Sequence, residues 1–421
     1  MAHFKVKATG IPKPTYQWQV STGGSPFSAV GASTSALSVT ATAADSGSLY
    51  RAVVSNPSGT VTTQPASLSI EPPGGGPKVK PLIVGLIDKG SEQPYHLAQL
   101  FPVTDTAEIG AYSPAFSGTV VNETWAQLEP TMGKWDFAPL DASLAAVSAY
   151  DSAHPGNPLG VKLRVWGGLT APEWAKTLDG TPITVPPASS TDVTGTVGRF
   201  WSTDYEQQWA AFQTALAGRY DSNPLLREVA VTSCNTASAE PFVMDSTVIT
   251  ALLGAGWTSL DQQRCLEGAL ADFSAWQHTA VDFTFNPFTD VSASGVQTPD
   301  LPFASTIMSE CAVSGIEGRL PQCILDNHGL TDSVLPRQTG LYAEIDALWQ
   351  QYDHWVPVDF QTISPNGFNL CLALGIGIAY HAQSIEIWPP GPGFAGFDQY
   401  TPAQLTPWED ALLTGTQPSC T

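Results

Sequence analysis

The sequence predicts a multidomain protein in which a small all-β domain precedes a larger α/β domain. A stretch rich in proline and glycine, EPPGGGPKVK at residues 71–80, separates two kinds of pattern. Before this stretch, short runs alternate apolar and polar side chains, which is typical of antiparallel strands. After it, apolar runs alternate with longer helical segments, which indicates repeated β/α units. We expect residues 1–70 to form a β-sandwich, residues 71–80 a linker and residues 81–421 a (β/α)8 barrel, or TIM barrel.

Eight apolar runs are the expected strands of the larger domain, and they span residues 82–87, 118–123, 160–166, 228–233, 280–286, 322–327, 356–362 and 384–388. Helical segments such as LDASLAAVSAY and DYEQQWAAFQTALAGRY lie between them. Eight such units over about 340 residues fit a TIM barrel with insertions. A doubly wound open sheet is the alternative. It usually has a glycine-rich turn after its first strand, and GLIDKGSEQ does not match that turn.

The charge of the chain bears on its partners. Acidic residues outnumber basic ones 38 to 17, which gives a formal net charge of −21. This excess would repel nucleic acids and anionic membranes, so neither is an expected partner. There is no apolar run of about 18 residues, the length that a membrane span needs. The composition suits a protein with neutral partners.

Six cysteines all follow residue 230, and no two form a CxxC pair. An even number of cysteines in an acidic chain indicates disulfides and secretion, and six cysteines allow 15 pairings. We expect the local pairs 234–265, 311–323 and 371–420. Six buried free thiols in a cytosolic protein are the alternative. The first residues, MAHFKVK, do not form a signal peptide and start within a strand-like segment, so we expect the sequence to be truncated at its start.

Two pieces of the first domain resemble an immunoglobulin-like domain. ATGIPKPTYQW resembles its B–C region and ADSGSLYRAVVSN its E–F corner. The resemblance covers about 70 residues and implies that Trp18 is the core tryptophan and Tyr50 the corner tyrosine. The two core cysteines of the family would fall near Val6 and Ala52, so this copy lacks that disulfide. A spacer, a docking surface or a support for the second domain is the expected role.

The active site of a TIM barrel gathers at the carboxyl ends of its strands. Polar and aromatic side chains follow the expected strands here, namely Asp88, Glu123, Trp125, Arg164, Trp166, Asn235, Glu240, Asn286, Asp326, His328, Gln361, Glu386 and Trp388. This set lacks the HxH of metal-dependent barrel hydrolases, a GxSxG elbow and a phosphate-binding glycine loop, so we expect no metal and no cofactor. Two glutamates beside tryptophans fit cleavage of a glycosidic bond, in which one carboxyl protonates the leaving oxygen and the other attacks or activates water.

Three segments of the second domain resemble the clan A glycoside hydrolases. VVNETWAQLEPTMGKWDFAPLD resembles their second-strand segment, VKLRVWGGLTAPEWAK their third, and SAEPF the Asn–Glu–Pro signature after the fourth strand. The resemblance implies that Glu240 is the acid/base. It spans most of residues 81–421 and does not name a family within the clan.

The chain departs from the clan at two positions. Ala239 stands where the clan has an asparagine, which Asn235 could replace. Gln361, in VDFQTIS, stands on the seventh strand, where the clan has its nucleophilic glutamate. Three explanations remain: the nucleophile has moved to Glu386, a glutamate has been changed to glutamine, or the barrel binds glycan without cutting it. We favour the first, with Glu386 as the nucleophile.

Each candidate also has a purely structural interpretation. Glu240 could be an ion-paired loop carboxylate, and the tryptophans Trp125, Trp166 and Trp388 could belong to the core instead of stacking on sugars. Arg164 is expected to orient a carboxylate, with Glu123 as its partner. Asn235, Asn286, His328 and Gln361 are expected to bind sugar hydroxyls. Asp282 and Asp359 are expected to face the helices.

The sequence therefore predicts a secreted glycoside hydrolase for a neutral polysaccharide or oligosaccharide. We expect a retaining mechanism with Glu240 as acid/base and Glu386 as nucleophile. A retaining mechanism requires carboxyl groups about 5–5.5 Å apart and an inverting one about 6.5–9.5 Å. The alternative is an inactive glycan-binding or adhesion protein on the same scaffold. A barrel hydrolase that acts on other substrates is a third possibility, although the metal or activated serine or cysteine that it requires is not evident.

Overall fold

A computed structural model of the 421-residue chain provides the structure. It describes residues 2–21, 26–31, 33–39, 48–63, 65–68, 79–90, 103–186, 194–236, 239–243, 245–316, 320–352, 354–363, 368–390, 396–414 and 417–420. The chain divides into two compact units, Met1–Lys78 and Val79–Thr421. Most of the expected linker, residues 71–78, lies outside the described residues.

The first unit contains two antiparallel sheets. One pairs β1 (Ala2–Lys5) with β4 (Ala36–Val39). The other has the order β3-β2-β5-β6, with β7 on β5, and its strands are β2 (Thr15–Ser21), β3 (Ser28–Ala29), β5 (Ser48–Asn56), β6 (Gly59–Thr62) and β7 (Ala66–Leu68). Both sheets contribute to one small core around Trp18, Leu37 and Tyr50. The core is thus built from the expected tryptophan and tyrosine, and the immunoglobulin-like assignment stays a prediction.

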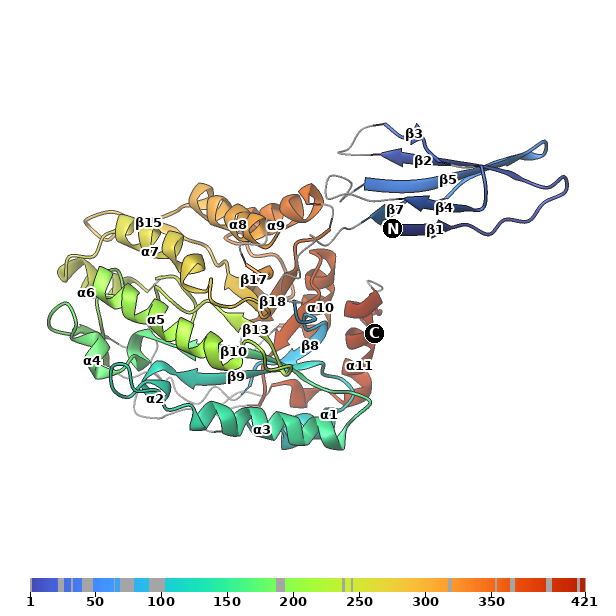
Figure 1. The fold of residues 1–421 in the computed structure, drawn as a ribbon. Helices are drawn as coiled ribbons and strands as arrows, with labels where there is room; N and C mark the ends of the chain where they lie inside the picture. Colours follow the sequence, from blue (N-terminus) through green and yellow to red (C-terminus); the bar gives the residue numbers. More distant parts are fainter. Residues whose placement is uncertain are drawn as a thin grey trace. The chain divides into compact units, whose positions relative to one another are not determined.

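Eight parallel strands of the second unit form a closed barrel (Figure 1). In chain order they are β8 (Gly85–Asp88), β9 (Gly118–Thr124), β10 (Gly160–Trp166), β13 (Leu226–Ala230), β14 (Ala280–Thr284), β17 (Cys323–Leu330), β18 (Val358–Thr362) and β19 (Ser384–Ile387). Every expected strand is present, and the closure of the sheet excludes the open doubly wound alternative. Two further strand pairs, β11 (Ile183–Val185) with β12 (Gly195–Val197) and β15 (Thr289–Val291) with β16 (Gln297–Pro299), lie outside the barrel sheet.

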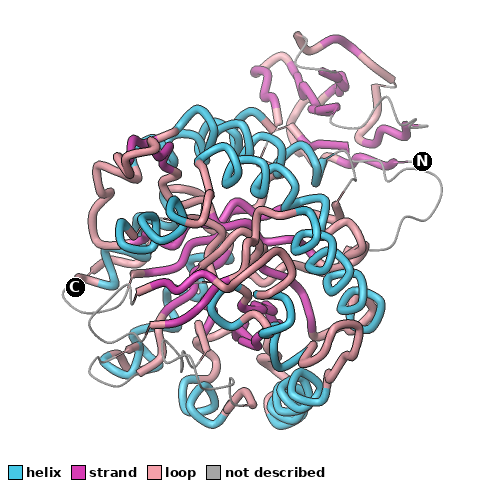
Figure 2. Tube along the Cα trace, turned by 90° about the vertical axis from the view of Figure 1, so that its left-hand side faces the viewer, coloured by secondary structure: helices cyan, strands magenta, loops and turns pink. Residues whose placement is uncertain are grey.

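Helices surround the barrel strands (Figure 2). They are α1 (Ala107–Tyr112), α2 (Trp125–Leu128), α3 (Ala138–Ala153), α4 (Glu173–Lys176), α5 (Thr203–Tyr220), α6 (Ser246–Gly254), α7 (Ser259–Asp272), α8 (Leu301–Ile316), α9 (Thr339–Gln351), α10 (Leu370–Ala379) and α11 (Pro402–Thr414), with short 3₁₀ turns at Gly168–Thr170 and Phe397–Gln399. Within the described residues, no helix has the length and apolar character that a membrane crossing requires.

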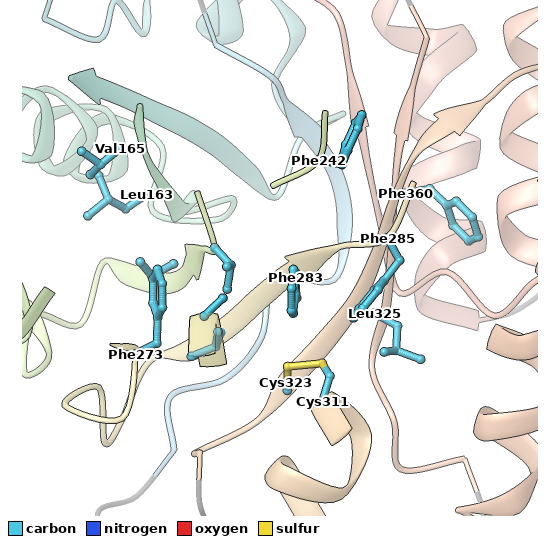
Figure 3. Packing of buried hydrophobic residues seen from close by; sticks show 14 of the residues in the cluster. Leu163, Val165, Phe242, Phe273, Phe283, Phe285, Cys311, Cys323, Leu325 and Phe360 are labelled. Atoms are coloured by element: carbon cyan, nitrogen blue, oxygen red, sulfur yellow. A yellow bond between two sulfur atoms is a disulfide. The ribbon is translucent and has the colours of Figure 1, made fainter. Parts of the chain in front are cut away.

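Alternation along the strands builds the core between barrel and helices. Successive side chains of a strand point to opposite faces, so every second residue faces outward. Leu163 and Val165 of β10 and Phe283 of β14 belong to this outward set and are buried in one large cluster (Figure 3). The residues between them face the barrel interior, where the functional side chains lie.

The barrel closes where β19 pairs with β8, which joins Ser384 to Gly85. Glu409 of α11 secures this seam, because it accepts hydrogen bonds from the Leu86 backbone N–H and the Ser117 hydroxyl. Gly85 has φ 130°, and a Cβ at this position would lie 2.3 Å from Oε1 of Glu409. Only glycine therefore fits between the first strand and the last helix.

Three disulfides confirm the expected local pairing. Cys234 bonds Cys265, Cys371 bonds Cys420, and Cys311 of α8 bonds Cys323 of β17 (Figure 3). The first of them fixes the segment that follows β13 to helix α7. These bonds exclude the alternative of six free thiols.

Candidate active site

A buried lysine lies at the centre of the barrel. Nζ of Lys162, on β10, is 2.6 Å from Asp282, 2.7 Å from Asp359 and 3.0 Å from Glu386, and none of these side chains is more than 1% exposed. Glu228 lies 3.6 Å from the same nitrogen. Asp282 and Asp359 therefore face the interior, and the prediction that they face the helices is wrong.

Arg164 lies two residues further along β10 and binds Glu386 of β19. One guanidinium nitrogen, Nη2, is 2.8 Å from each of the two carboxylate oxygens of Glu386. The side chain of Glu386 is 0% exposed, and that of Arg164 is 3% exposed. Arg164 thus orients a carboxylate as expected, but its partner is Glu386 and not Glu123. Glu123 accepts a hydrogen bond from Ser143 of α3, outside the barrel interior.

The carboxyl groups of this interior cluster differ in the direction of their pKa shifts. Burial alone would raise the pKa of Glu386, but Arg164 and Lys162 lower it to about 2. Burial and the nearby Asp359 raise the pKa of Glu228 to about 8. Burial and Asp326 also raise the pKa of Asp282. Glu386 is therefore the ionised partner of Arg164, whereas Glu228 carries a proton near neutral pH.

Glu240 lies at the carboxyl end of the barrel, in the segment after β13, and its side chain is 22% exposed. Its Oε1 is 2.9 Å from Nδ1 of His328, on β17. The other ring nitrogen of His328, Nε2, is 2.6 Å from Oδ2 of the fully buried Asp326. A linear series of Asp326, His328 and Glu240 thus runs from the interior to the mouth of the barrel.

The two buried members of this series are strongly coupled. Burial alone would lower the pKa of His328, but Asp326 and Glu240 raise it to about 9. The charge of His328 in turn holds the pKa of Asp326 below its usual range, against the effect of burial. His328 is therefore an imidazolium near neutral pH, with a proton on the nitrogen that faces Glu240.

Two groups of three potential metal ligands occur among the described residues, Asp326 with His328 and Glu386, and Glu228 with Asp282 and Asp359. The second group surrounds the Lys162 ammonium, and the first includes the carboxylate that Arg164 binds. Lys162 and Arg164 thus already contact members of both groups.

The expected sugar-binding amides occupy different environments. Asn286 accepts a hydrogen bond from Asn327 Nδ2 at 3.3 Å. Asn235 is 2% exposed, and its Nδ2 has no hydrogen-bond partner within the described chain. Gln361 is 3% exposed, and its Oε1 has no such partner either.

The three tryptophans also differ in their environments. Trp125 is 0% exposed and packs edge-on against Trp174, Tyr205 and Trp209, so its ring belongs to the core and is not placed to stack on a sugar. Helix α2 begins at Trp125 with a capping box from Thr124, so strand β9 ends at Thr124 and Trp125 is helical.

Trp166 and Trp388 lie at the barrel mouth. Trp166 packs on Ala239, next to Glu240, and donates to Asn122 Oδ1 at 2.9 Å. Lys89 lies 3.5 Å from the centre of one Trp388 ring, and Trp388 lines a hollow with Thr362 and further aromatic residues, Phe368, Phe397 and Tyr400. Trp388 thus presents an aromatic wall beside the ends of β18 and β19.

The structure brings Glu240, His328, Arg164 and Glu386 together in one region. It does not place Glu386 as an accessible nucleophile, because both of its oxygens are buried and bound to Arg164. Lys162 was missed. It lies two residues before Arg164 on the same strand, so the alternation that places Arg164 in the interior also predicts an interior Lys162.

Comparison with known proteins gives no match to a family model. Over 70 residues, 17% of this chain, it is 40% identical to Endoglucanase C of Cellulomonas fimi, of whose length this stretch covers 6%.

Solved structures with a similar fold include endoglycoceramidase II from Rhodococcus sp., with 15% identity, coverage of 76% of this chain and 78% of that chain, and a TM-score of 0.43. They also include an endo-β-1,4-glucanase from Xanthomonas axonopodis pv. citri, with 12% identity, coverage of 79% and 99%, and a TM-score of 0.44. Both of these proteins are glycoside hydrolases.

Proposed function

We propose that the barrel unit is a glycoside hydrolase domain that cleaves a neutral polysaccharide or oligosaccharide, with Glu240 as the proton donor. The observation that supports this proposal is the series Asp326–His328–Glu240, which ends in a partly exposed carboxyl at the mouth of the barrel. Active sites of TIM barrels lie at this end.

The series supplies a proton where glycoside cleavage needs one. Nδ1 of the His328 imidazolium faces Oε1 of Glu240 and can transfer its proton to that oxygen. Asp326 binds the other ring nitrogen, Nε2, and keeps its proton in place. Glu240 then protonates the glycosidic oxygen as it leaves. Glu240 is the catalytic residue in this scheme, and His328 and Asp326 are positioning residues that keep it supplied with a proton.

The class of substrate follows from charge and aromatic character. A chain with a formal net charge of −21 repels acidic glycans, and Trp166 and Trp388 offer apolar rings at the mouth. Three disulfides accord with an extracellular protein, which would meet polysaccharides outside the cell.

Release of reducing ends from a panel of neutral polysaccharides tests this function. Glu240→Gln should lower turnover by about 10²–10⁴-fold, the usual contribution of a general acid. Glu267→Gln, an exposed position on α7, is the matched control and should retain full activity. Equal turnover by wild type and Glu240→Gln would contradict the assignment of the proton donor.

A second function, glycan binding without cleavage, is favoured by one observation. Gln361 stands on the seventh strand and Glu386 is buried, so the described site offers no accessible carboxylate to act as nucleophile. Calorimetric binding of a polysaccharide that wild type never cleaves would support this function. Gain of turnover in Gln361→Glu alone would identify the missing nucleophile as its cause.

A further inference from the structure

The carboxylates next to Glu240 are not available to attack a sugar. Asp326 and Glu386 are each 0% exposed, the first bound to His328 and the second to Arg164 and Lys162. Asp88, at the end of β8, is 5% exposed and accepts from Thr119. Glu240 is therefore the partly exposed carboxyl of this group, although a retaining hydrolase ordinarily requires two.

The amide side chain of Gln361 lies next to Glu386 in the barrel sheet. Gln361 pairs in register with Glu386 across β18 and β19. It shares a strand face with Asp359, which contacts Lys162 in the interior, whereas Phe360 between them packs outward on Tyr342 of α9. Gln361 therefore faces the barrel interior.

Gln361 also lies near the proton donor. Its register partner Glu386 offers an oxygen within 4.8 Å of ligand atoms of both Asp326 and His328. His328 contacts Glu240 directly, at 2.9 Å. Glu386 and His328 thus connect Gln361 with Glu240.

The side-chain oxygen of Gln361 lacks a hydrogen bond. Its Oε1 is buried and has no donor within the described chain. A buried acceptor without a donor is unfavourable unless a ligand satisfies it, so such a group at a functional site needs an explanation. A substrate N–H that points toward β18 would satisfy it.

We propose that the substrate carries a 2-acetamido-2-deoxy sugar at the cleavage site, and that the acetamido oxygen of this sugar takes the place of the missing protein nucleophile. Gln361 Oε1 accepts the acetamido N–H and holds the group beneath the anomeric carbon. This inference rests on the proposed glycoside hydrolase function and names its substrate class. Such sugars are neutral, as the charge of the chain requires.

The two steps balance without a second carboxylate. In the first, the acetamido oxygen bonds to the anomeric carbon as the bond to the leaving oxygen breaks, and Glu240 transfers its proton to that oxygen. The sugar becomes a cationic oxazolinium ring, whose N–H donates to Gln361. In the second step, Glu240 takes a proton from water, and the hydroxide adds to the anomeric carbon. The ring opens, and the sugar leaves with its original anomeric configuration.

Two disaccharides that differ only at the 2-positions test this proposal. The 4-nitrophenyl β-glycosides of N,N′-diacetylchitobiose and cellobiose are compared with wild-type protein. The first should be cleaved at least about 100-fold faster in kcat/KM, because an oriented internal nucleophile supplies much of the rate. A thiazoline analogue of the oxazolinium ring should bind, as measured by calorimetry.

Variants separate the role of Gln361 from general damage. Gln361→Ala should lower kcat/KM on the diacetylchitobioside by about 100-fold, the usual effect of a misplaced reacting group, and should weaken thiazoline binding. Gln383→Ala is the matched control. It changes another glutamine with a buried amide atom that lacks a hydrogen bond, at the opposite, amino-terminal end of β19, and should change neither value.

Each outcome decides between the two proposals. Glu240-dependent cleavage of glycans without acetamido groups, at rates equal to those with them, would overturn this inference and leave the hydrolase function standing. Failure to cleave any glycan, together with failure to bind the thiazoline, would overturn both. Binding of thiazoline that is unchanged in Gln361→Ala would remove Gln361 from the mechanism.

Discussion

Nδ1 of His328 lies 2.9 Å from Oε1 of Glu240, while its Nε2 lies 2.6 Å from the buried Asp326. The imidazole is therefore held between a buried carboxylate that keeps it protonated and a partly exposed carboxyl. Because the pKa of His328 is raised to about 9, the proton that this ring supplies is present throughout the neutral range.

Activity should consequently fall on the alkaline side as His328 loses its proton, near pH 9. His328→Gln should remove this alkaline limb from the pH profile of kcat and lower kcat itself by about 10–100-fold or more, as loss of proton supply does. His381→Gln is the control, since His381 also pairs with an aspartate, Asp346, but away from the site. An unchanged alkaline limb in His328→Gln would refute the role of the ring.

Stability should be greatest on the acidic side of neutrality. The folded pKa of Glu228 is raised from 4.5 to about 8, so its contribution to the free energy of unfolding falls as pH rises through this window. The contribution of His328 is complete below 6.5 and is lost as pH rises through about 9. Glu386, with a pKa lowered from 4.5 to about 2, stabilises above 4.5 and loses this effect as pH falls toward 2.

The midpoint of thermal unfolding, followed by near-ultraviolet circular dichroism, should therefore be highest at about pH 5. Glu228→Gln should flatten the decline of the midpoint between pH 5 and 8, because it removes the group that titrates there. The amide oxygen can still accept from the Ile83 N–H, so the fold keeps that hydrogen bond. A midpoint that rises over this range in wild type would contradict the raised pKa of Glu228.

Lys162→Met should destabilise the barrel by about 3–5 kcal/mol, because it leaves buried carboxyls without their cation. Denaturant unfolding at neutral pH measures this loss. Arg264→Met is the comparison, since Arg264 is 66% exposed and 3.9 Å from Asp261, and it should leave the unfolding midpoint nearly unchanged. Similar midpoints for the two variants would mean that the interior cluster does not depend on the lysine.

Replacing Cys234 and Cys265 together by serine should lower stability by about 3–4 kcal/mol, given the 31-residue separation that the bond spans. It should also lower kcat, because this disulfide fixes the segment between β13 and Glu240. The pair Cys311 and Cys323 provides the control, since its bond lies between α8 and β17. Its loss should lower stability without a matching loss of kcat at the temperature where both variants remain folded.

Much of the barrel could be predicted from the sequence, because each strand is a short apolar run between helical segments. The disulfides could also be predicted, because each one joins two cysteines that follow one another in the sequence. The direction in which strand carboxylates point was harder to predict. Asp282 and Asp359 lie in runs that are apolar on both faces, so the alternation of hydrophobic residues does not indicate which face is the interior.

The role of Glu386 could not be predicted for a related reason. A glutamate between Ile385 and Ile387 is equally consistent with a nucleophile and with a buried ion pair. Only the three-dimensional structure shows that Arg164 binds both of its oxygens. Trp125 was misjudged because a capping box at Thr124 starts a helix where the apolar pattern alone suggests a strand end.

The seam between β8 and β19 has a consequence for synthesis of the chain. Gly85 and Leu86 emerge from the ribosome some 300 residues before Ser384 and Glu409, their partners in the closed barrel. Until then β8 has an unpaired edge and a backbone N–H without its carboxylate. An unpaired strand edge is open to edge-to-edge association, so the nascent barrel has this weakness until Ser384 and Glu409 have been translated.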